Sequence, residues 1–188
     1  MDERSVDLER FRGYLTMLAR LQVGSRLQGK LGASDVVQQT LVQAVAGMKD
    51  FRGRSDAETA AWLRQILARQ LANVARDLGR QKRDIARERS LEAALDKSAC
   101  RLEQFLATHD SSPSQRAQRN EQLWALADAL SDLPEAQREA VVLHHLEGWR
   151  LEQIAQHLER SPAAVGGLLK RGLRTLRQRL QRSGSDAS

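Results

Sequence analysis

The feature that most constrains this chain is a pair of helical segments near its C-terminal end, joined by a three-residue turn at 159–161. Apolar residues at helical spacing predict a first helix over 151–158, and a second helix starts at Pro162. The stretch 162–182 contains six basic residues and no acidic one. A positive helix behind a tight turn suits a phosphate-lined groove, so the segment predicts a helix-turn-helix that binds nucleic acid.

The residue types around the turn fit this motif. Ala155 is small enough to let the two helices cross closely. Ser161 can cap the second helix by accepting a hydrogen bond from a backbone N–H, and Pro162 is tolerated in the first helical turn. Glu159 stands where glycine is common in such turns. The apolar residues expected to fill the small core between the helices are Ile154, Leu158, Val165 and Leu168.

Two adjacent glycines, Gly166 and Gly167, are unusual inside the second helix. Each costs about 1 kcal/mol of helix stability relative to alanine. They also bring backbone rather than side chain towards whatever lies opposite. The pair therefore leaves two readings open: either the helix approaches its groove very closely, or direct readout of base edges is sparse.

Length and composition restrict the class of protein. The 188 residues carry a net charge of +6, which favours a polyanionic partner such as nucleic acid or an anionic membrane surface. No run approaches the roughly 20 apolar residues that span a bilayer, and the charged N-terminus lacks the core of a secretion signal. The single cysteine, Cys100, fits a reducing compartment. We therefore expect a cytoplasmic protein without membrane insertion.

The spacing of reactive side chains does not suggest an enzyme. His144 and His145 are adjacent, so they do not have the i, i+4 spacing of helical metal ligands. No glycine-rich phosphate loop, nucleophile elbow or paired-carboxylate arrangement is visible. We expect no catalytic residue, no metal site and no cofactor.

Helical periodicity also organises the N-terminal half. It predicts helices over 6–23, 35–48 and 58–78, with Ser34 as the N-cap of the second. The second helix has an apolar stripe made of Val37, Leu41, Val45 and Met48. Its other face carries Gln38, Gln39 and Gln43, which are polar but uncharged, and this suits a partner surface better than bulk water. Phe51 is equally compatible with stacking on a base and with closing the core, whereas Trp62 keeps the spacing of a buried stripe.

The pattern as a whole predicts an all-α fold with two small helical domains joined by a linker. The N-terminal helical bundle covers 1–83, and the helix-turn-helix domain covers 114–183, followed by a tail at 184–188. Mixed charges and a Ser-Pro cluster mark 84–113 as the linker, with some helix around Leu91, Leu95 and Leu102. In the C-terminal domain we expect a helix from Ser114 to about 132 and another over 135–146, ended by Gly148.

Two separate segments resemble one family. The stretch SDVVQQTLVQAVAGMKDFRGR, followed by AWLRQILARQLANVARDLGRQKRD, is similar to the second conserved region of bacterial RNA polymerase sigma factors. The segment 133–180 resembles their fourth conserved region. Because only a linker separates the two, the chain resembles the small extracytoplasmic-function (ECF) group. The resemblance implies a non-enzymatic specificity subunit that binds core RNA polymerase, recognises promoter DNA and starts transcription.

The resemblance also assigns residues to surfaces. The residues expected to bind core polymerase are Asp35, Val36, Val37, Gln38, Gln39, Leu41 and Val42. The residues expected to bind the minus-ten element and the melted strand are Phe51, Arg52, Arg54, Arg64, Arg69, Arg76, Arg80, Lys82 and Arg83. The residues of the helix-turn-helix at 151–170 and just beyond it expected to bind the minus-thirty-five element are Ser161, Ala163, Ala164, Gly167, Lys170, Arg171 and Arg174. The length of the linker further predicts that an anti-sigma factor can clamp the two domains together.

Two other classes compete with this interpretation. One is a stand-alone helix-turn-helix regulator whose N-terminal bundle serves dimerisation or sensing. The other is a helical adaptor that binds only protein, which the basic second helix disfavours. The uncharged glutamine face beside Asp35 separates the sigma factor from the stand-alone regulator. A sigma factor needs such a face to bind polymerase, and a free regulator does not.

Overall fold

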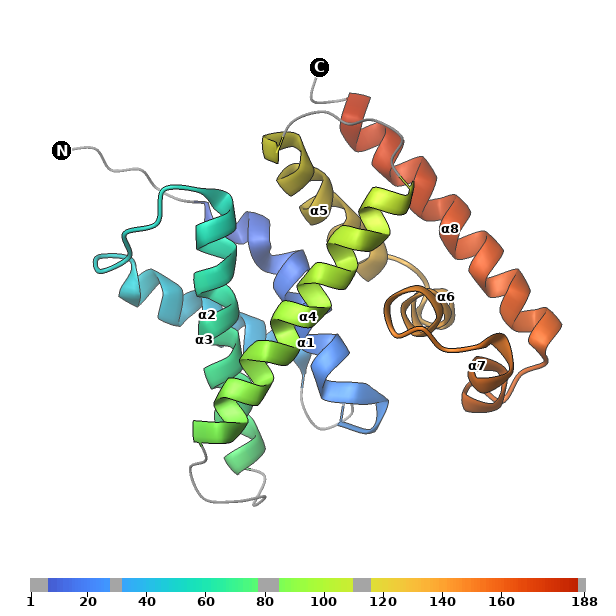
Figure 1. Cartoon of the computed structure of the whole chain (residues 1–188), viewed down its shortest axis with the longest axis horizontal. Coiled ribbons are helices and arrows are strands. Elements are labelled where there is room, and N and C mark those ends of the chain that lie inside the picture. The colour runs from blue at the N-terminus through green and yellow to red at the C-terminus, as the bar shows by residue number, and fades with distance from the viewer. Residues whose placement is uncertain (1–6, 28–31, 78–84, 110–115, 186–188) are drawn as a thin grey trace. The chain divides into compact units, whose positions relative to one another are not determined.

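The computed structural model describes residues 7–27, 32–77, 85–109 and 116–185, and no strand occurs among them. These residues form η1 (Leu8–Phe11), α1 (Arg12–Leu27), α2 (Ala33–Gly47), α3 (Asp56–Asp77), α4 (Ile85–His109), α5 (Arg116–Ser131), α6 (Glu135–Val141), η2 (Val142–Leu146), α7 (Leu151–His157) and α8 (Pro162–Ser185) (Figure 1). The all-α prediction is confirmed. None of the described helices is long and apolar enough to cross a membrane.

The chain divides into two compact units, Met1–Ala99 and Cys100–Ser188. The division falls inside α4, where the sequence predicted a linker with only some helix. This long helix forms because Leu95, Ala99, Leu102 and Leu106 recur at helical spacing and are all buried. The sequence predicted helix around Leu91, Leu95 and Leu102, and α4 extends that helix over 85–109. The predicted domain boundaries at 83/84 and 113/114 lie outside the described residues.

Unit 1 is built on the apolar faces of α1, α2 and α3, each of which contacts the other two. Its fully buried residues include Phe11, Leu15, Leu18, Val37, Leu63 and Leu67. The first part of α4 packs on this bundle through Leu95. A hydrogen bond of 3.0 Å also joins Gln22 Nε2 of α1 to Ser98 Oγ of α4. The three-helix bundle is therefore extended by a fourth helix in the same unit.

The start of α2 differs from the sequence prediction. Its N-cap is Gly32, and Ser34 lies inside the first turn without capping it. The Asp35 carboxylate occupies the space beside Gly32, since a Cβ on that glycine would come within 2.6 Å of Asp35 Oδ2. A side chain at position 32 would therefore require the Asp35 carboxylate to move. Asp35 does lie in the first turn, where its charge favours the positive end of the helix.

Unit 2 packs α5, α6 and α7 against α8. The fully buried residues Leu126, Leu130, Val141 and Ile154 form its centre. At the crossing of α6 and α8, Gly172 is buried, and a Cβ there would come within 2.9 Å of Val141 Cγ2. Glycine at this position therefore lets the two helices approach more closely than any side chain would permit.

The helix predicted over 135–146 is present but not uniform. It is α-helical to Val141 and continues as one π-helical turn, η2. It ends before Gly148, as predicted, and that glycine has a positive φ of 75°. The Nδ1 atom of His144 lies 2.9 Å from the carbonyl oxygen of Trp149, which ties the π turn to the start of α7.

Candidate nucleic-acid and protein interfaces

The turn between α7 and α8 has the geometry of a helix-turn-helix. Glu159 has a φ of 52°, the only positive value among the described non-glycine residues. The left-handed residue reverses the chain, and the amide of Arg160 then donates to the carbonyl of Ala155 at 2.9 Å. Ser161 caps α8 as predicted, with its Oγ accepting from the amide of Ala164 at 3.2 Å. Of the expected core, Ile154, Val165 and Leu168 are buried, as is Ala155 at the crossing, whereas Leu158 is only half-buried.

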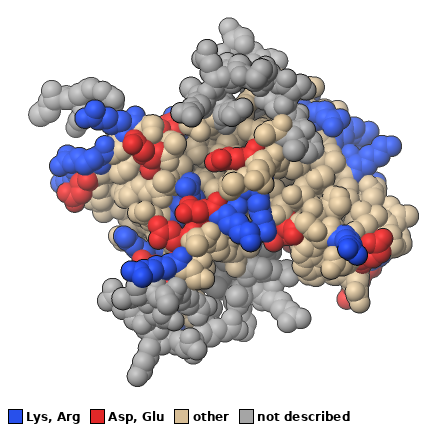
Figure 2. All heavy atoms as spheres, in the orientation of Figure 1, with Lys and Arg blue, Asp and Glu red and all other residues tan. Residues whose placement is uncertain are grey.

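The exposed face of α8 is strongly cationic, and basic side chains gather in several patches on the surface drawn in Figure 2. Ala163, Gly167, Lys170 and Arg174 follow the helical spacing of one face, so the predicted contacts lie side by side. The guanidinium of Arg171 lies back over Gly167, where a Cβ would come within 3.3 Å of Arg171 Nη1. The first two turns therefore present small residues, and the cations begin at the third.

One of the six cations of α8 is compensated, contrary to the sequence reading. Arg179 forms an ion pair with Asp132, the residue that follows α5. Lys170, Arg171, Arg174, Arg177 and Arg182 form no ion pair with any other residue in the described part of the chain. A carboxylate far away in sequence cannot be assigned to a helix from helical spacing alone.

The exposed face of α2 is the second candidate surface. Asp35, Gln38 and Gln39 are exposed on it, together with two large apolar side chains, Val42 at 49% and Val45 at 66% exposure. Unpartnered apolar side chains beside polar ones are typical of a protein-binding patch. Val45 was not among the residues predicted on this surface, because helical spacing places it in the apolar stripe of α2.

Three residues that the sequence predicted on this surface face the interior of the helical bundle instead. Val36, Val37 and Leu41 are buried, with at most 4% of their surface exposed. They pack against the bundle because α2 contacts both α1 and α3. These residues support the helix and are corrected from contact residues to core residues.

A cavity of about 640 Å³ lies between the end of α2, the following loop and α3. Its lining residues are Gln43, Ala46, Gly47, Asp50, Phe51, Arg52, Trp62, Ile66, Arg69 and Gln70. Phe51 stacks on Trp62 with ring centroids 4.4 Å apart and an angle of 16° between the planes. Both rings are half-buried, so Trp62 is not the purely internal residue that its spacing predicted.

A ring contact and a set of hydrogen bonds hold the loop that forms this cavity. The Phe51 ring lies against Gly53, where a Cβ would come within 2.1 Å of the ring's Cζ atom. At the start of α3, Glu58 Oε2 accepts from the backbone amides of Arg54 at 2.6 Å and Ser55 at 3.0 Å. These bonds, with one from the Ser55 hydroxyl, lower the pKa of Glu58. The loop is therefore anchored at both ends.

The predicted minus-ten arginines fall into three groups. Arg52, Arg54, Arg69 and Arg76 are exposed, although Arg69 pairs with Glu88 at 3.1 Å and Arg76 bonds Asn73. Arg80, Lys82 and Arg83 lie outside the described residues.

Arg64 is the third case, and it is a correction. Its guanidinium donates to Asp96 Oδ1 at 2.7 Å and to Tyr14 Oη at 3.0 Å, with only 17% of its side chain exposed. Burial works against the charge, but the fields of Tyr14 and Asp96 and the hydrogen bonds to them outweigh it, so the pKa of Arg64 is raised. Arg64 joins three helices internally and does not face solvent. The sequence could not show this because its partners lie 50 and 32 residues away.

The described residues contain no group of three or more His, Cys, Asp or Glu side chains that could hold a metal ion. The geometry combines a capped helix-turn-helix with a free cationic face, an exposed apolar and amide face on α2, and a cavity lined by stacked aromatic rings. It defines the helix-turn-helix class of DNA-binding proteins, and the exposed face of α2 has the composition typical of a protein-binding patch.

Comparison with known proteins makes the assignment specific. Residues 123–176, from α5 into α8, match the family described as Sigma-70, region 4. The chain is 32% identical over 173 residues to the RNA polymerase sigma factor CarQ of Myxococcus xanthus, covering 91% of this chain and 83% of that protein. It is 31% identical over 149 residues to the probable RNA polymerase sigma factor RfaY of Xanthomonas campestris pv. campestris, covering 79% of this chain but 34% of that protein. The chain belongs to the RNA polymerase sigma factors, in the ECF group, and functions as a sigma factor in transcription initiation.

Proposed function

We propose that three surfaces of this sigma factor divide the work of initiation. The exposed face of α2 binds core RNA polymerase, the cavity after α2 receives an unstacked base of the minus-ten element, and α8 docks on the minus-thirty-five element. The observation that carries the proposal is the contrast between their chemistries. The α2 face carries apolar and amide side chains, the cavity is lined by stacked aromatic rings, and the exposed face of α8 is cationic.

The α2 face supports a protein contact better than a nucleic-acid contact. Its exposed members are Asp35, Gln38, Gln39, Val42 and Val45, and none of them is basic. Phosphates would be repelled by Asp35 and would gain nothing from the valines. The same side chains fit the apolar centre and polar rim of a protein interface.

The cavity supports base capture. Its volume of about 640 Å³ lies within the roughly 300–1,000 Å³ of small-molecule pockets. Phe51 and Trp62 provide a flat aromatic wall, and Gln43 and Gln70 provide amides that can pair with a base edge. Extruding a base costs a few kcal/mol of stacking and pairing, which such a pocket offsets without nucleotide hydrolysis. The sigma factor needs no catalytic group of its own in this proposal.

The freed strand then needs a positive track. Arg52, Arg54, Arg69 and Arg76 are exposed and can contact phosphates, with Arg69 first leaving Glu88. Arg80, Lys82 and Arg83 remain proposed contacts from sequence.

The first turns of α8 support recognition of duplex mainly through its backbone. Ser161 is engaged in its cap, and Ala163, Ala164 and Gly167 have no side-chain donor. Lys170, Arg171 and Arg174 follow on the exposed face and form no ion pair with a described residue. Small residues permit close docking, and the cations neutralise phosphates.

The proposal of an anti-sigma partner and of a cytoplasmic location rests on the sequence alone. The stand-alone regulator is not favoured, because the CarQ alignment covers 91% of this chain, including the N-terminal unit that a free regulator would not share.

Binding to core polymerase and promoter-dependent run-off transcription test the proposal. Replacing Asp35 and Gln38 together by alanine should weaken core binding by roughly tenfold or more, because centrally placed interface residues dominate affinity. Gln65→Ala, an exposed glutamine of α3 outside all three surfaces, is the matched control and should bind as wild type. Wild-type affinity in the double variant would show that the α2 face is not the interface.

A further inference from the structure

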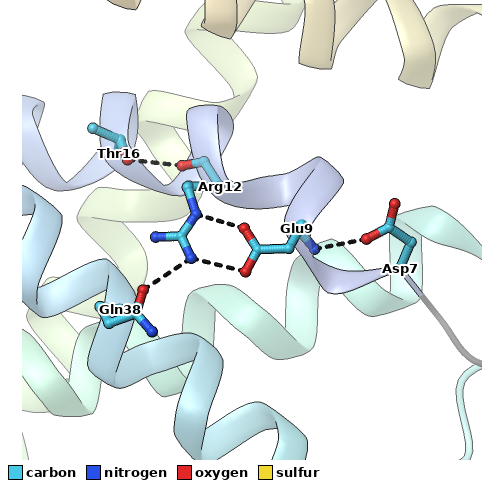
Figure 3. A network of polar contacts seen from close by, with 5 residues as sticks. All are labelled: Asp7, Glu9, Arg12, Thr16 and Gln38. Atoms are coloured by element: carbon cyan, nitrogen blue, oxygen red, sulfur yellow. Dashed lines mark hydrogen bonds and ion pairs between the residues drawn. The ribbon is translucent and has the colours of Figure 1, made fainter.

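We propose that Arg12 is a positioning residue for core polymerase: it orients the Gln38 amide so that the NH₂ group faces outward as a hydrogen-bond donor. The inference rests on the proposed use of α2 as the core-binding face. Arg12 lies at the start of α1, and its Nη2 donates to Gln38 Oε1 at 2.9 Å (Figure 3). The contact joins two helices across 26 residues of sequence.

Arg12 is itself held in place. Its Nε and Nη2 donate to the two carboxylate oxygens of Glu9 at 2.6 and 2.8 Å, a bidentate pair within η1 and α1. The hydrogen bond with Arg12 lowers the pKa of Glu9, and the bond with Glu9 raises that of Arg12. The amide of Glu9 in turn donates to Asp7 Oδ1 at 3.1 Å, which caps η1. The guanidinium plane is thus set before any partner arrives.

The direction of the Gln38 amide follows from chemistry. A guanidinium has donors and no acceptor, so the Gln38 atom that faces Arg12 must be the carbonyl oxygen. The Nε2 atom therefore points away, as Figure 3 shows, and it has no hydrogen-bond partner among the described residues. Gln38 is exposed between Asp35 and Val42 on the proposed interface. The matching group on core polymerase is an acceptor, either a carboxylate or a backbone carbonyl.

Fixing this side chain in advance removes part of the entropy cost of binding. A free glutamine would sample several rotamers and both orientations of its amide. Arg12 selects one rotamer and one amide orientation of Gln38, and it does so through the Oε1 atom, which leaves Nε2 free for core polymerase. The effect of Arg12 on affinity should therefore depend on Gln38, which a purely structural role of Arg12 would not require.

A double-mutant cycle on the affinity of the full-length protein for core polymerase tests this dependence. Arg12→Ala should weaken binding roughly fivefold when Gln38 is present and by less than about twofold in the Gln38→Ala background. Arg10→Ala is the control. It also removes one positive charge, two residues before Arg12, but it breaks an ion pair with Asp56 and not a contact to α2. It should leave core affinity unchanged. Thermal unfolding of each variant shows whether it is folded at the assay temperature.

Gln38→Glu tests the outward donor directly. The carboxylate still accepts from Arg12 but has no N–H to offer, so binding should fall at least as far as in Gln38→Ala. Wild-type affinity for Gln38→Glu, or an equal loss from Arg12→Ala in both backgrounds, would overturn the inference. If Gln38→Ala and the Asp35 and Gln38 double variant both bind as wild type, the proposed interface itself is wrong, and that result is distinct from the other two.

Discussion

Single residues set the geometry of both proposed nucleic-acid surfaces, and Glu159 is the clearest case. Its φ of 52° is unfavourable for a residue with a Cβ, by roughly 1–2 kcal/mol, and easy for glycine. The helix-turn-helix nevertheless requires this conformation, because the next amide bonds back to Ala155. The turn is therefore strained at one position.

We expect Glu159→Gly to stabilise unit 2 by about 0.5–1 kcal/mol, since the relief of strain exceeds the extra chain entropy of glycine. Hydrogen exchange of the α7 and α8 amides measures the local stability. Arg160→Gly, one residue further on at a non-positive φ, adds entropy without relief and should destabilise the same amides. An unchanged or faster exchange in Glu159→Gly would contradict the strain argument.

Gly53 has the same importance for the cavity. A Cβ at this position would overlap the Phe51 ring, so Gly53→Ala should push the ring off Trp62. The loss of one stacking surface, about 1–3 kcal/mol, predicts roughly a tenfold or greater drop in promoter opening. Fluorescence of a base analogue placed in the minus-ten element reports opening. Affinity for core polymerase should not change, and normal opening would show that the Phe51 ring is not used.

At the scale of whole elements, α8 depends on its crossing with α6. Gly172 lies at that crossing with no room for a methyl group, whereas a Cβ on Gly166 meets nothing within 4 Å. We expect Gly172→Ala to destabilise unit 2 by about 1–3 kcal/mol through overpacking. Gly166→Ala should stabilise it by up to about 1 kcal/mol through helix propensity. Urea unfolding measures the free energy of unfolding of each variant. Equal effects of the two substitutions would mean that α6 and α8 can move apart to accommodate the added methyl group.

A carboxyl pair at the end of α5 makes stability depend on pH. Partial burial, and then the charge of Asp132 just beyond the last residue of α5, raise the pKa of Asp128. Folding therefore favours protonated Asp128, and this contribution is lost as the pH rises from the ordinary carboxyl value, 3.8, through the raised one.

Asp128→Asn should accordingly unfold at a higher temperature than wild type at pH 7. The difference should disappear at a pH below the ordinary carboxyl value, where both side chains are neutral. Asp132→Asn serves as the contrast, because it also removes the ion pair with Arg179. Calorimetry at the two pH values measures the effect, and an equal advantage at both would exclude the carboxyl charge as its cause.

At the scale of the whole molecule, the distribution of free positive charge decides how the holoenzyme responds to salt. Lys170 and Arg174 are exposed and form no ion pair with a described residue, whereas Arg64 is committed to Asp96 and Tyr14. The affinity of the holoenzyme for promoter DNA falls with salt concentration. Lys170→Gln and Arg174→Gln should each reduce the slope of the logarithm of that affinity against the logarithm of the salt concentration by about 1. Arg64→Gln should leave that slope intact and destabilise unit 1 by about 1–3 kcal/mol. A reduced slope in Arg64→Gln would return Arg64 to the DNA-contacting set.

The sequence by itself determined the features that depend on local spacing. Helical periodicity and capping chemistry located the helix-turn-helix, the Ser161 cap, the polar face of α2 and the loop at Phe51, because each depends on residues within a turn or two. Packing in three dimensions set the burial of Val36 and which charges stay free. Val36 is buried against the bundle, Arg64 pairs with Asp96 of α4, and Arg179 pairs with Asp132 just beyond α5. Packing also formed α4 within the expected linker. Burial and ion pairing depend on neighbours that are distant in sequence, and only packing brings those neighbours together.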